Sequence, residues 1–381
     1  MPGMTSIWQP GQLLFAGFEG TEVPRELAEL LAQGRLGGVI LFARNIAGPG
    51  QVARLTATLH AAAPADVPAL LAIDQEGGRV QRLRAPWTEW PPMRWLGERD
   101  EPATTAAVAA ALARELSDLG IGLDFAPVVD VDTNPLNPVI GDRSFARTPE
   151  RVAKHAAAFI TAMQAAGVAA CAKHFPGHGD TKSDSHLELP SLDHDLDRLR
   201  AVELPPFRAA IAAGVASVMT AHVLFPRLDK ARPATLAPDV MNLLREELGY
   251  DGVVFGDDLE MKAVADHFAP EPLVRGCLGA GCDGLLVCRR MDLVLEVLRL
   301  LERTPDAQLE QPLRRMVALK QKYAPAHRQR VLGEQPAAAA KPGIVADLFA
   351  APELLRVPEP VVHGPPYAEH LELAERLRRE R

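Results

Sequence analysis

Short apolar runs of strand length alternate along the chain with longer segments in which apolar residues recur at helical spacing. The strand-length runs occupy residues 13–18, 38–42, 69–73, 123–129, 169–172, 216–220, 252–255 and 284–287. Segments with helical periodicity lie between or after them, at residues 25–32, 51–62, 104–119, 149–166, 196–213, 239–248 and 293–302. Repeated strand–helix units are typical of a parallel sheet. Because eight units close a TIM-type barrel, the pattern predicts an α/β fold with a single (β/α)8 barrel.

The chain changes character after Tyr323. Eight prolines lie between Ala324 and Tyr367, alanines fill residues 337–340, and residues 369–381 are rich in charge. Apolar residues are too sparse there for a second core. We therefore expect a catalytic barrel over residues 1–323 and a Pro/Ala-rich extension over residues 324–381 that ends in a short charged helix.

Composition narrows the class of protein. A net charge of −8 argues against nucleic-acid or anionic membrane partners, which attract clustered positive charge. No run reaches the length of a membrane helix and the first residues lack a secretory signal pattern, so we expect a cytoplasmic protein. The four cysteines have no CxxC spacing, which favours reduced, buried thiols at Cys171, Cys277, Cys282 and Cys288.

Polar residues follow the predicted strands at their carboxyl ends, where barrel enzymes place their catalytic groups. Two insertions, residues 84–101 and 131–148, also follow strands and should overhang the same face. The strand exits carry Glu19, Arg44, Asn45, Asp74, Gln75, Glu76, Asp130, Asp132, Lys173, His174, His222, Asp257, Asp258, Arg289 and Arg290. Polar residues are expected where burial ends, but this does not explain why carboxylates and histidines dominate at this rim.

The densest cluster runs from Lys173 to His186 in a stretch broken by glycines, which predicts a loop that can move over the barrel mouth. Asp184 and His186 are two residues apart, so in an extended stretch the carboxylate can orient the imidazole for proton transfer. Two other interpretations stay open: a metal site on His174, His178 and His186, and simple loop hydrogen bonding.

Two further segments could contribute. Residues 253–261 place Asp257 and Asp258 after a buried strand; one suits a glycosidase nucleophile, and the other suits a helix cap. Asp74, followed by Gly77 and Gly78, suits paired sugar hydroxyls. Arg143 is ambiguous between salt-bridge support and ligand contact.

Together these segments resemble family 3 glycoside hydrolases, most closely the single-domain bacterial β-N-acetylglucosaminidases of peptidoglycan recycling. The resemblance rests on residues 74–82, 141–145, 173–186, 219–222, 233–236 and 255–261, in the family's order. It implies that Asp257 is the nucleophile and that His186 is the acid/base, with Asp184 as its dyad partner. It implies sugar-binding roles for Asp74, Arg82, Arg143, Lys173 and His174. Gly256, where a serine is usual, and Ala146, where a glycine is usual, depart from the family pattern.

The resemblance implies a retaining exo-β-N-acetylglucosaminidase that hydrolyses terminal β-linked GlcNAc of muropeptides through a covalent glycosyl-enzyme intermediate. It would need no metal and no cofactor, take a small-molecule sugar as its partner, and exist as a monomer or homodimer. A β-N-acetylglucosaminide phosphorylase is the nearest alternative, since an imidazole acid/base tolerates an anionic acceptor; a β-glucosidase-type enzyme is another. Alternatives of other classes are a metal-dependent barrel hydrolase and a non-catalytic sugar-binding barrel.

Overall fold

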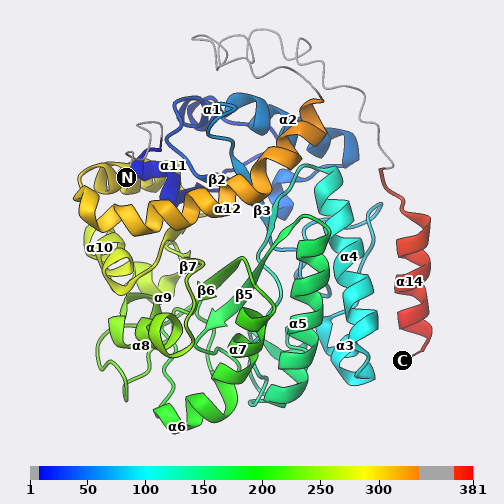
Figure 1. Cartoon of the computed structure of the whole chain (residues 1–381), viewed down its shortest axis with the longest axis vertical. Helices are drawn as coiled ribbons and strands as arrows, with labels where there is room; N and C mark the ends of the chain where they lie inside the picture. The colour runs from blue at the N-terminus through cyan, green and yellow to red at the C-terminus, as the bar shows by residue number, and fades with distance from the viewer. Residues whose placement is uncertain (1–7, 334–363, 381) are drawn as a thin grey trace.

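A closed barrel of parallel strands forms the centre of the computed structural model, which describes residues 8–333 and 364–380 (Figure 1). Each strand pairs with the next in chain order, and β8 pairs with β1 to close the barrel. The strands are β1 (Leu14–Ala16), β2 (Gly38–Leu41), β3 (Leu70–Ile73), β4 (Leu123–Asp124), β5 (Ala169–Phe175), β6 (Ser217–Thr220), β7 (Val253–Asp258) and β8 (Gly284–Val287). The predicted single (β/α)8 barrel is confirmed.

The barrel interior is filled by aromatic side chains. Phe255 packs edge-to-face against both Phe15 and Phe125, with ring centroids 5.2 Å and 5.4 Å apart. All three rings are buried, so strands from opposite parts of the barrel meet in one core. The four cysteines are free and buried as predicted.

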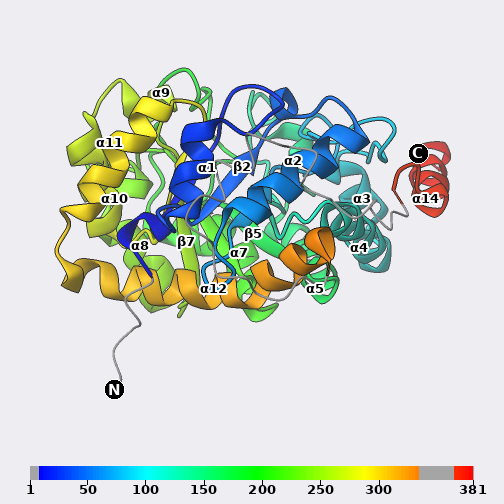
Figure 2. The same cartoon turned by 90° about the horizontal axis from the view of Figure 1, so that it is seen from above.

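Helices surround the strands (Figures 1 and 2). The seven segments with predicted helical periodicity all form helices, whereas the helices at residues 93–99, 262–265, 270–280 and 306–332 were not predicted. The helices are α1 (Arg25–Ala32), α2 (Pro49–Ala62), α3 (Met93–Arg99), α4 (Pro102–Asp118), α5 (Pro149–Ala165), α6 (Leu196–Arg198), α7 (Leu204–Ala212), α8 (Pro238–Asn242), α9 (Lys262–Ala265), α10 (Pro270–Ala280), α11 (Met291–Glu302), α12 (Asp306–Leu332) and α14 (Ala368–Arg379). One π-helical segment joins α6 to α7, and another extends α8. No helix in the described ranges is long and apolar enough to cross a membrane.

Two strands are longer than predicted, and both extensions include candidate residues. β5 continues through Lys173 and His174 to Phe175, which pairs with Thr220, and β7 continues through Asp257 to Asp258, which pairs with Leu286. These residues are therefore held by strands and not by loops. β4 is shorter than expected because Pro127, which has no N–H, interrupts the ladder.

The C-terminal part also differs from the expected division. Helix α12 passes Tyr323, where we expected the barrel part to end, and continues to Leu332 with Pro325 inside it. Its continuation is fastened, since Ala324 is buried and His327 Nε2 lies 2.9 Å from the Gly167 carbonyl oxygen. The Pro/Ala-rich stretch at 334–363 lies outside the described residues.

The charged terminal helix is present as α14, which lies beside α4 (Figures 1 and 2). His370 Nδ1 is 2.7 Å from Glu115 Oε1 on α4, and its ring lies 5.9 Å from that of Trp90. Tyr367 donates a hydrogen bond to Asp118 at 3.0 Å. The end of the chain therefore covers the first insertion, in which Trp90 is buried.

Candidate active site

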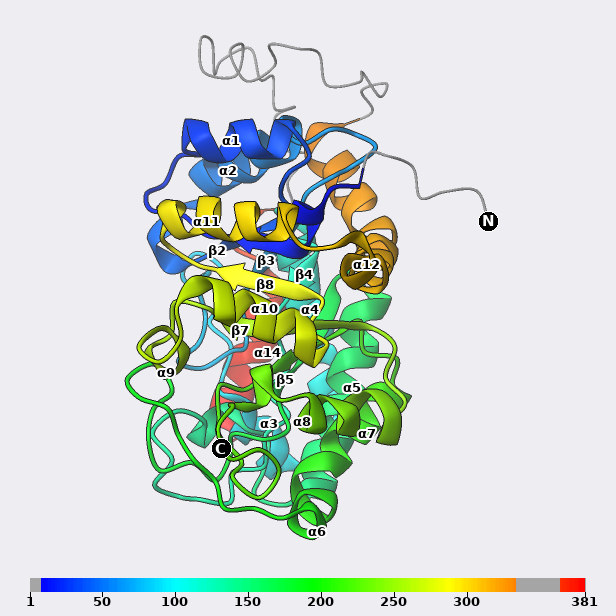
Figure 3. The same ribbon diagram turned by 90° about the vertical axis from the view of Figure 1, so that its left-hand side faces the viewer.

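A cavity of about 270 Å³ opens at the carboxyl ends of the strands and is lined by seven of the eight predicted site residues. In Figure 3 the arrow of strand β8 points to the left, which is the end of the barrel where the carboxyl ends of the parallel strands lie. The seven are Asp74, Arg82, Arg143, Lys173, His174, His186 and Asp257. The eighth, Asp184, lies behind His186 and is hydrogen-bonded to it. The structure thus brings together residues from β5, β7, the segment after β3, and the loops at residues 131–148 and 176–189.

Asp74 lies at the centre of a charged cluster on the wall formed by β3 and β5. Its carboxylate is 2.8 Å from Lys173 Nζ and 3.0 Å from the Arg82 guanidinium. Burial alone would raise the pKa of Asp74, but the two cations hold it well below its usual range. Asp74 is therefore ionised and held in place by its two partners.

Glu76 belongs to the same cluster, although the family resemblance implied no role for it. Arg143 holds it through two contacts of 2.8 Å, and Lys173 Nζ lies 2.6 Å away. These cations outweigh the effect of burial and lower the pKa of Glu76 to about 2. The two carboxylates in turn raise the pKa of Lys173. Arg143 therefore gives salt-bridge support to Glu76, and it also lines the cavity.

His174 is oriented by a second unassigned carboxylate, that of Asp130. His174 Nδ1 lies 2.7 Å from Asp130 Oδ2, and the backbone N–H of His178 donates to Asp130 Oδ1 at 2.6 Å. Burial opposes ionisation of Asp130, but these contacts lower its pKa below the ordinary value. The position of Asp130 and Glu76 at strand exits was the signal available in the sequence.

Asp257 and Asp258 are adjacent but have different surroundings. Asp257 accepts the backbone N–H of Asp258 at 2.8 Å, and the imidazoles of His222 and His174 offset burial, so its pKa is lowered. Asp258 accepts the backbone N–H groups of Glu260 and Cys288. Burial without a cation raises the pKa of Asp258 to about 7. Asp257 is thus the ionised carboxylate of the pair, while Asp258 holds the turn before α9.

His186 lies on the loop after β5, residues 176–189, which we call the histidine loop. Its side chain is 63% exposed, and its Nδ1 lies 2.8 Å from Asp184 Oδ1. Asp184 also accepts the backbone N–H of His186 at 2.8 Å, and these bonds outweigh partial burial and lower its pKa. With Nδ1 engaged, Nε2 is the ring nitrogen available for proton exchange.

The histidines of a metal-site interpretation have protein partners instead. His178 Nδ1 is 2.9 Å from Thr181 Oγ1, and His178 Nε2 is 3.0 Å from Ser185 Oγ. Burial lowers the pKa of His178 to about 4, so the ring is neutral near pH 7. Within the described ranges, no three His, Cys, Asp or Glu residues are grouped as metal ligands would be.

The two departures from the family pattern leave these groups in place. A Cβ atom on Gly256 would lie 3.3 Å from Thr235 Cγ2, so a serine there would press on Thr235. Ala146 is buried, and its N–H reaches Ser144 Oγ at 3.3 Å.

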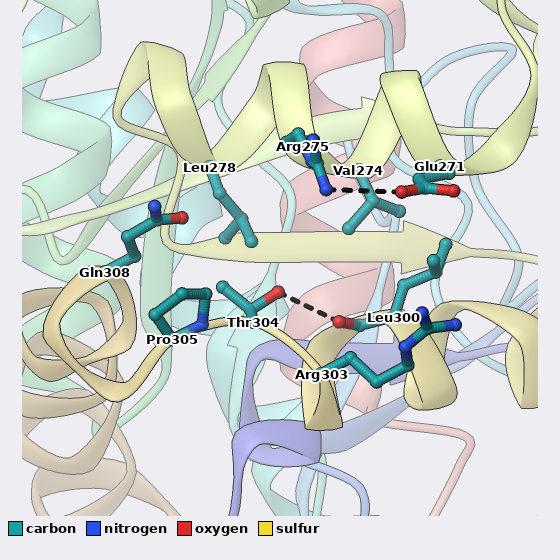
Figure 4. A pocket seen from close by; sticks show the side chains of 9 residues that line it. All are labelled: Glu271, Val274, Arg275, Leu278, Leu300, Arg303, Thr304, Pro305 and Gln308. Atoms are coloured by element: carbon teal, nitrogen blue, oxygen red, sulfur yellow. Dashed lines mark hydrogen bonds and ion pairs between the residues drawn. The ribbon is translucent and has the colours of Figure 1, made fainter.

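A different cavity, between α10 and α11, contains none of the predicted residues (Figure 4). Its charged groups include the exposed Arg275–Glu271 pair at 3.2 Å, and Thr304 donates to the Leu300 carbonyl oxygen. Exposed ion pairs of this kind are screened by water and are not held in a fixed position for a substrate. The rim of the barrel is therefore the candidate active site.

Comparison with known proteins defines the class of this barrel as a glycoside hydrolase. Residues 8–319 match the glycosyl hydrolase family 3 N terminal domain. The chain belongs to glycosyl hydrolase family 3. A β-hexosaminidase of Methylococcus capsulatus is 43% identical over 289 residues, which cover 74% of this chain and 84% of that protein.

Solved structures agree with this assignment. A family 3 β-N-acetylglucosaminidase from Paenibacillus sp. has a TM-score of 0.83 at 39% identity, covering 98% of this chain and 68% of that one. Native NagZ from Neisseria gonorrhoeae has a TM-score of 0.75 at 35% identity, covering 90% of this chain and 98% of that one.

Proposed function

We propose that the protein is a retaining exo-β-N-acetylglucosaminidase that removes terminal β-linked GlcNAc from peptidoglycan fragments. The observation that carries the proposal is that the ionised, half-buried Asp257 and the exposed His186 line one cavity. The names of the relatives support the N-acetylglucosaminyl part of the substrate. The cytoplasmic location and the monomeric or homodimeric state stay predictions.

In the first step a carboxylate oxygen of Asp257 attacks the anomeric carbon, and the bond from that carbon to the departing oxygen breaks. The doubly protonated His186 donates the proton on Nε2 to that oxygen, while Nδ1 keeps its hydrogen bond to Asp184. A carboxylate at Asp184 stabilises the positive imidazole at the start of this step.

In the second step water attacks the anomeric carbon of the glycosyl-enzyme, and the bond to Asp257 breaks. The neutral Nε2 of His186 accepts the proton of the water, which restores both groups. Two displacements at one carbon retain its configuration. Since the acid/base is an imidazole, it adds no second negative charge beside Asp257.

The charged wall holds the sugar during both steps. Asp74 offers carboxylate oxygens, and Lys173 and Arg82 offer N–H groups, all fixed by their own ion pairs. Such preset groups bind hydroxyls with little reorganisation.

Replacing His186 tests the acid role. His186→Ala should lower kcat/KM on a GlcNAc disaccharide on the order of 10²–10⁴-fold. The loss should be much smaller on a dinitrophenyl glycoside, whose leaving group needs no proton. His267→Ala, on the loop after α9, is the matched histidine control and should change neither rate. Equal losses on both substrates would remove His186 from the role.

Labelling tests the nucleophile. A fluorosugar inactivator should form a covalent adduct at Asp257, located by peptide mass spectrometry. An adduct at Asp258, or turnover through an oxazoline without any adduct, contradicts the assignment. The same assays run with phosphate should release GlcNAc; accumulation of the sugar 1-phosphate would make the enzyme a phosphorylase.

A further inference from the structure

One residue of the histidine loop is buried between two accessible neighbours. Ser185 is 2% exposed, whereas the side chains of Asp184 and His186 are 30% and 63% exposed. A buried polar residue needs partners, and its partners show where the loop is attached.

The Ser185 hydroxyl is attached to the base of its own loop. Its Oγ lies 3.0 Å from His178 Nε2, and the other ring nitrogen lies 2.9 Å from Thr181 Oγ1. A neutral imidazole has one donor and one acceptor, and two hydroxyls can satisfy both. His178 is itself held by Asp130, the residue that orients His174.

The Ser185 backbone is attached on the other side of the cavity. Its carbonyl oxygen accepts the N–H of Ala263 at 3.3 Å, in the first turn of α9. That turn follows the strand that carries Asp257. Ser185 therefore links the histidine loop to the residues that support His174 on one side and to the chain after the nucleophile on the other.

We infer that Ser185 is a positioning residue whose hydroxyl, bound to His178, seats the loop so that His186 faces the cavity that contains Asp257. This inference rests on the proposed acid/base role of His186. Without the bond to His178, Ser185 keeps its backbone contact to Ala263, and His186 spends less time where its proton can reach the leaving oxygen.

The test compares Ser185→Ala with Ser217→Ala, which removes another buried serine hydroxyl, bound to the Ala170 carbonyl oxygen on β5. Both are assayed on the GlcNAc disaccharide and on the dinitrophenyl glycoside. Ser185→Ala should lower kcat/KM roughly 3- to 10-fold on the disaccharide, the range expected for one neutral hydrogen bond. It should change the rate less than twofold on the activated glycoside. Ser217→Ala should leave both rates within twofold.

A double variant separates positioning from general damage. In the His186→Ala background, Ser185→Ala should cost nothing further on the disaccharide, because there is no acid left to position. Thermal unfolding of each variant shows whether the fold is retained.

Three results would overturn the inference: equal losses by Ser185→Ala on both substrates, the same loss again in the His186→Ala background, or no loss on the disaccharide. Its failure can be told from failure of the proposed function. If His186→Ala shows the leaving-group dependence and Ser185→Ala does not, only the positioning role is lost. If His186→Ala shows none, the acid assignment itself fails.

Discussion

The two sides of the active-site cavity are built differently. On the wall from β3 and β5, the carboxylates of Asp74 and Glu76 are each paired with two cations at 3.0 Å or less. On the opposite side Asp257 is held by one backbone N–H and nearby imidazoles, and His186 is paired only through Nδ1 with Asp184. The carboxylates of the wall are therefore paired with cations, whereas Asp257 and His186 keep atoms free for new bonds.

The largest effect should follow from removing the reacting carboxylate. Asp257→Ala should lower kcat/KM on the order of 10³–10⁵-fold on both substrates, because neither leaving group can replace the lost nucleophile. Azide should restore part of the rate on the activated glycoside, measured by its product of opposite configuration. Asp258→Asn, which keeps an acceptor oxygen, is the adjacent control and should retain activity within about tenfold. Similar losses at both positions would contradict the difference that we draw between them.

A substitution in the wall formed by β3 and β5 should chiefly lower the free energy of unfolding. Arg143→Met leaves the buried Glu76 with Lys173 alone, and breaking a buried ion pair costs about 3 kcal/mol or more of unfolding free energy. Arg275→Met breaks a pair that is exposed on both sides, so its cost should be below about 0.5 kcal/mol. Denaturant unfolding measures both. Equal costs would show that the wall is no more tightly paired than the surface.

A smaller effect should appear in the pH dependence of stability. Asp124 lies beneath the wall, accepts the Gln75 N–H at 2.9 Å, and has a pKa raised by burial to about 8. The folded state therefore binds this proton more tightly than the unfolded state, so stability falls as the pH rises from about 4 to 8. In Asp124→Asn this contribution is absent. Between pH 5 and pH 6 the wild-type unfolding free energy should fall by roughly 1 kcal/mol more than that of the variant, since each pH unit between the two pKa values is worth about 1.4 kcal/mol. A steeper fall in the variant would mean that Asp124 is ionised in the folded protein.

The sequence predicted the barrel because burial of parallel strands on both faces leaves a strong apolar pattern. Candidate residues such as Asp74 and Asp257 could be found because they interrupt that pattern at strand exits. The continuation of β5 through Lys173 and His174 could not be found, since polar residues in a strand read as a loop when their partners are unknown. The strand continues because Lys173 pairs with Val128 and Phe175 pairs with Thr220, and both partners lie far away in the sequence.

The partners of the site residues were equally hidden. Nothing local connects Glu76 with Arg143, which is 67 positions away, or Asp130 with His174. The end of the barrel part was placed too early, at Tyr323, because the prolines beyond it suggested that regular structure stops there. In the structure Ala324 is buried and His327 is bonded to Gly167, so tertiary contacts outweigh the local preference.

Helix α14 has a practical consequence for handling the protein. It lies beyond the residues that match the family, yet its His370 satisfies the buried Glu115 and its ring packs on Trp90. A version that lacks the helix, such as one cut back to the matching residues 8–319, would expose the Glu115 carboxylate and the Trp90 indole to water. Helix α14 should therefore be kept in any shortened version.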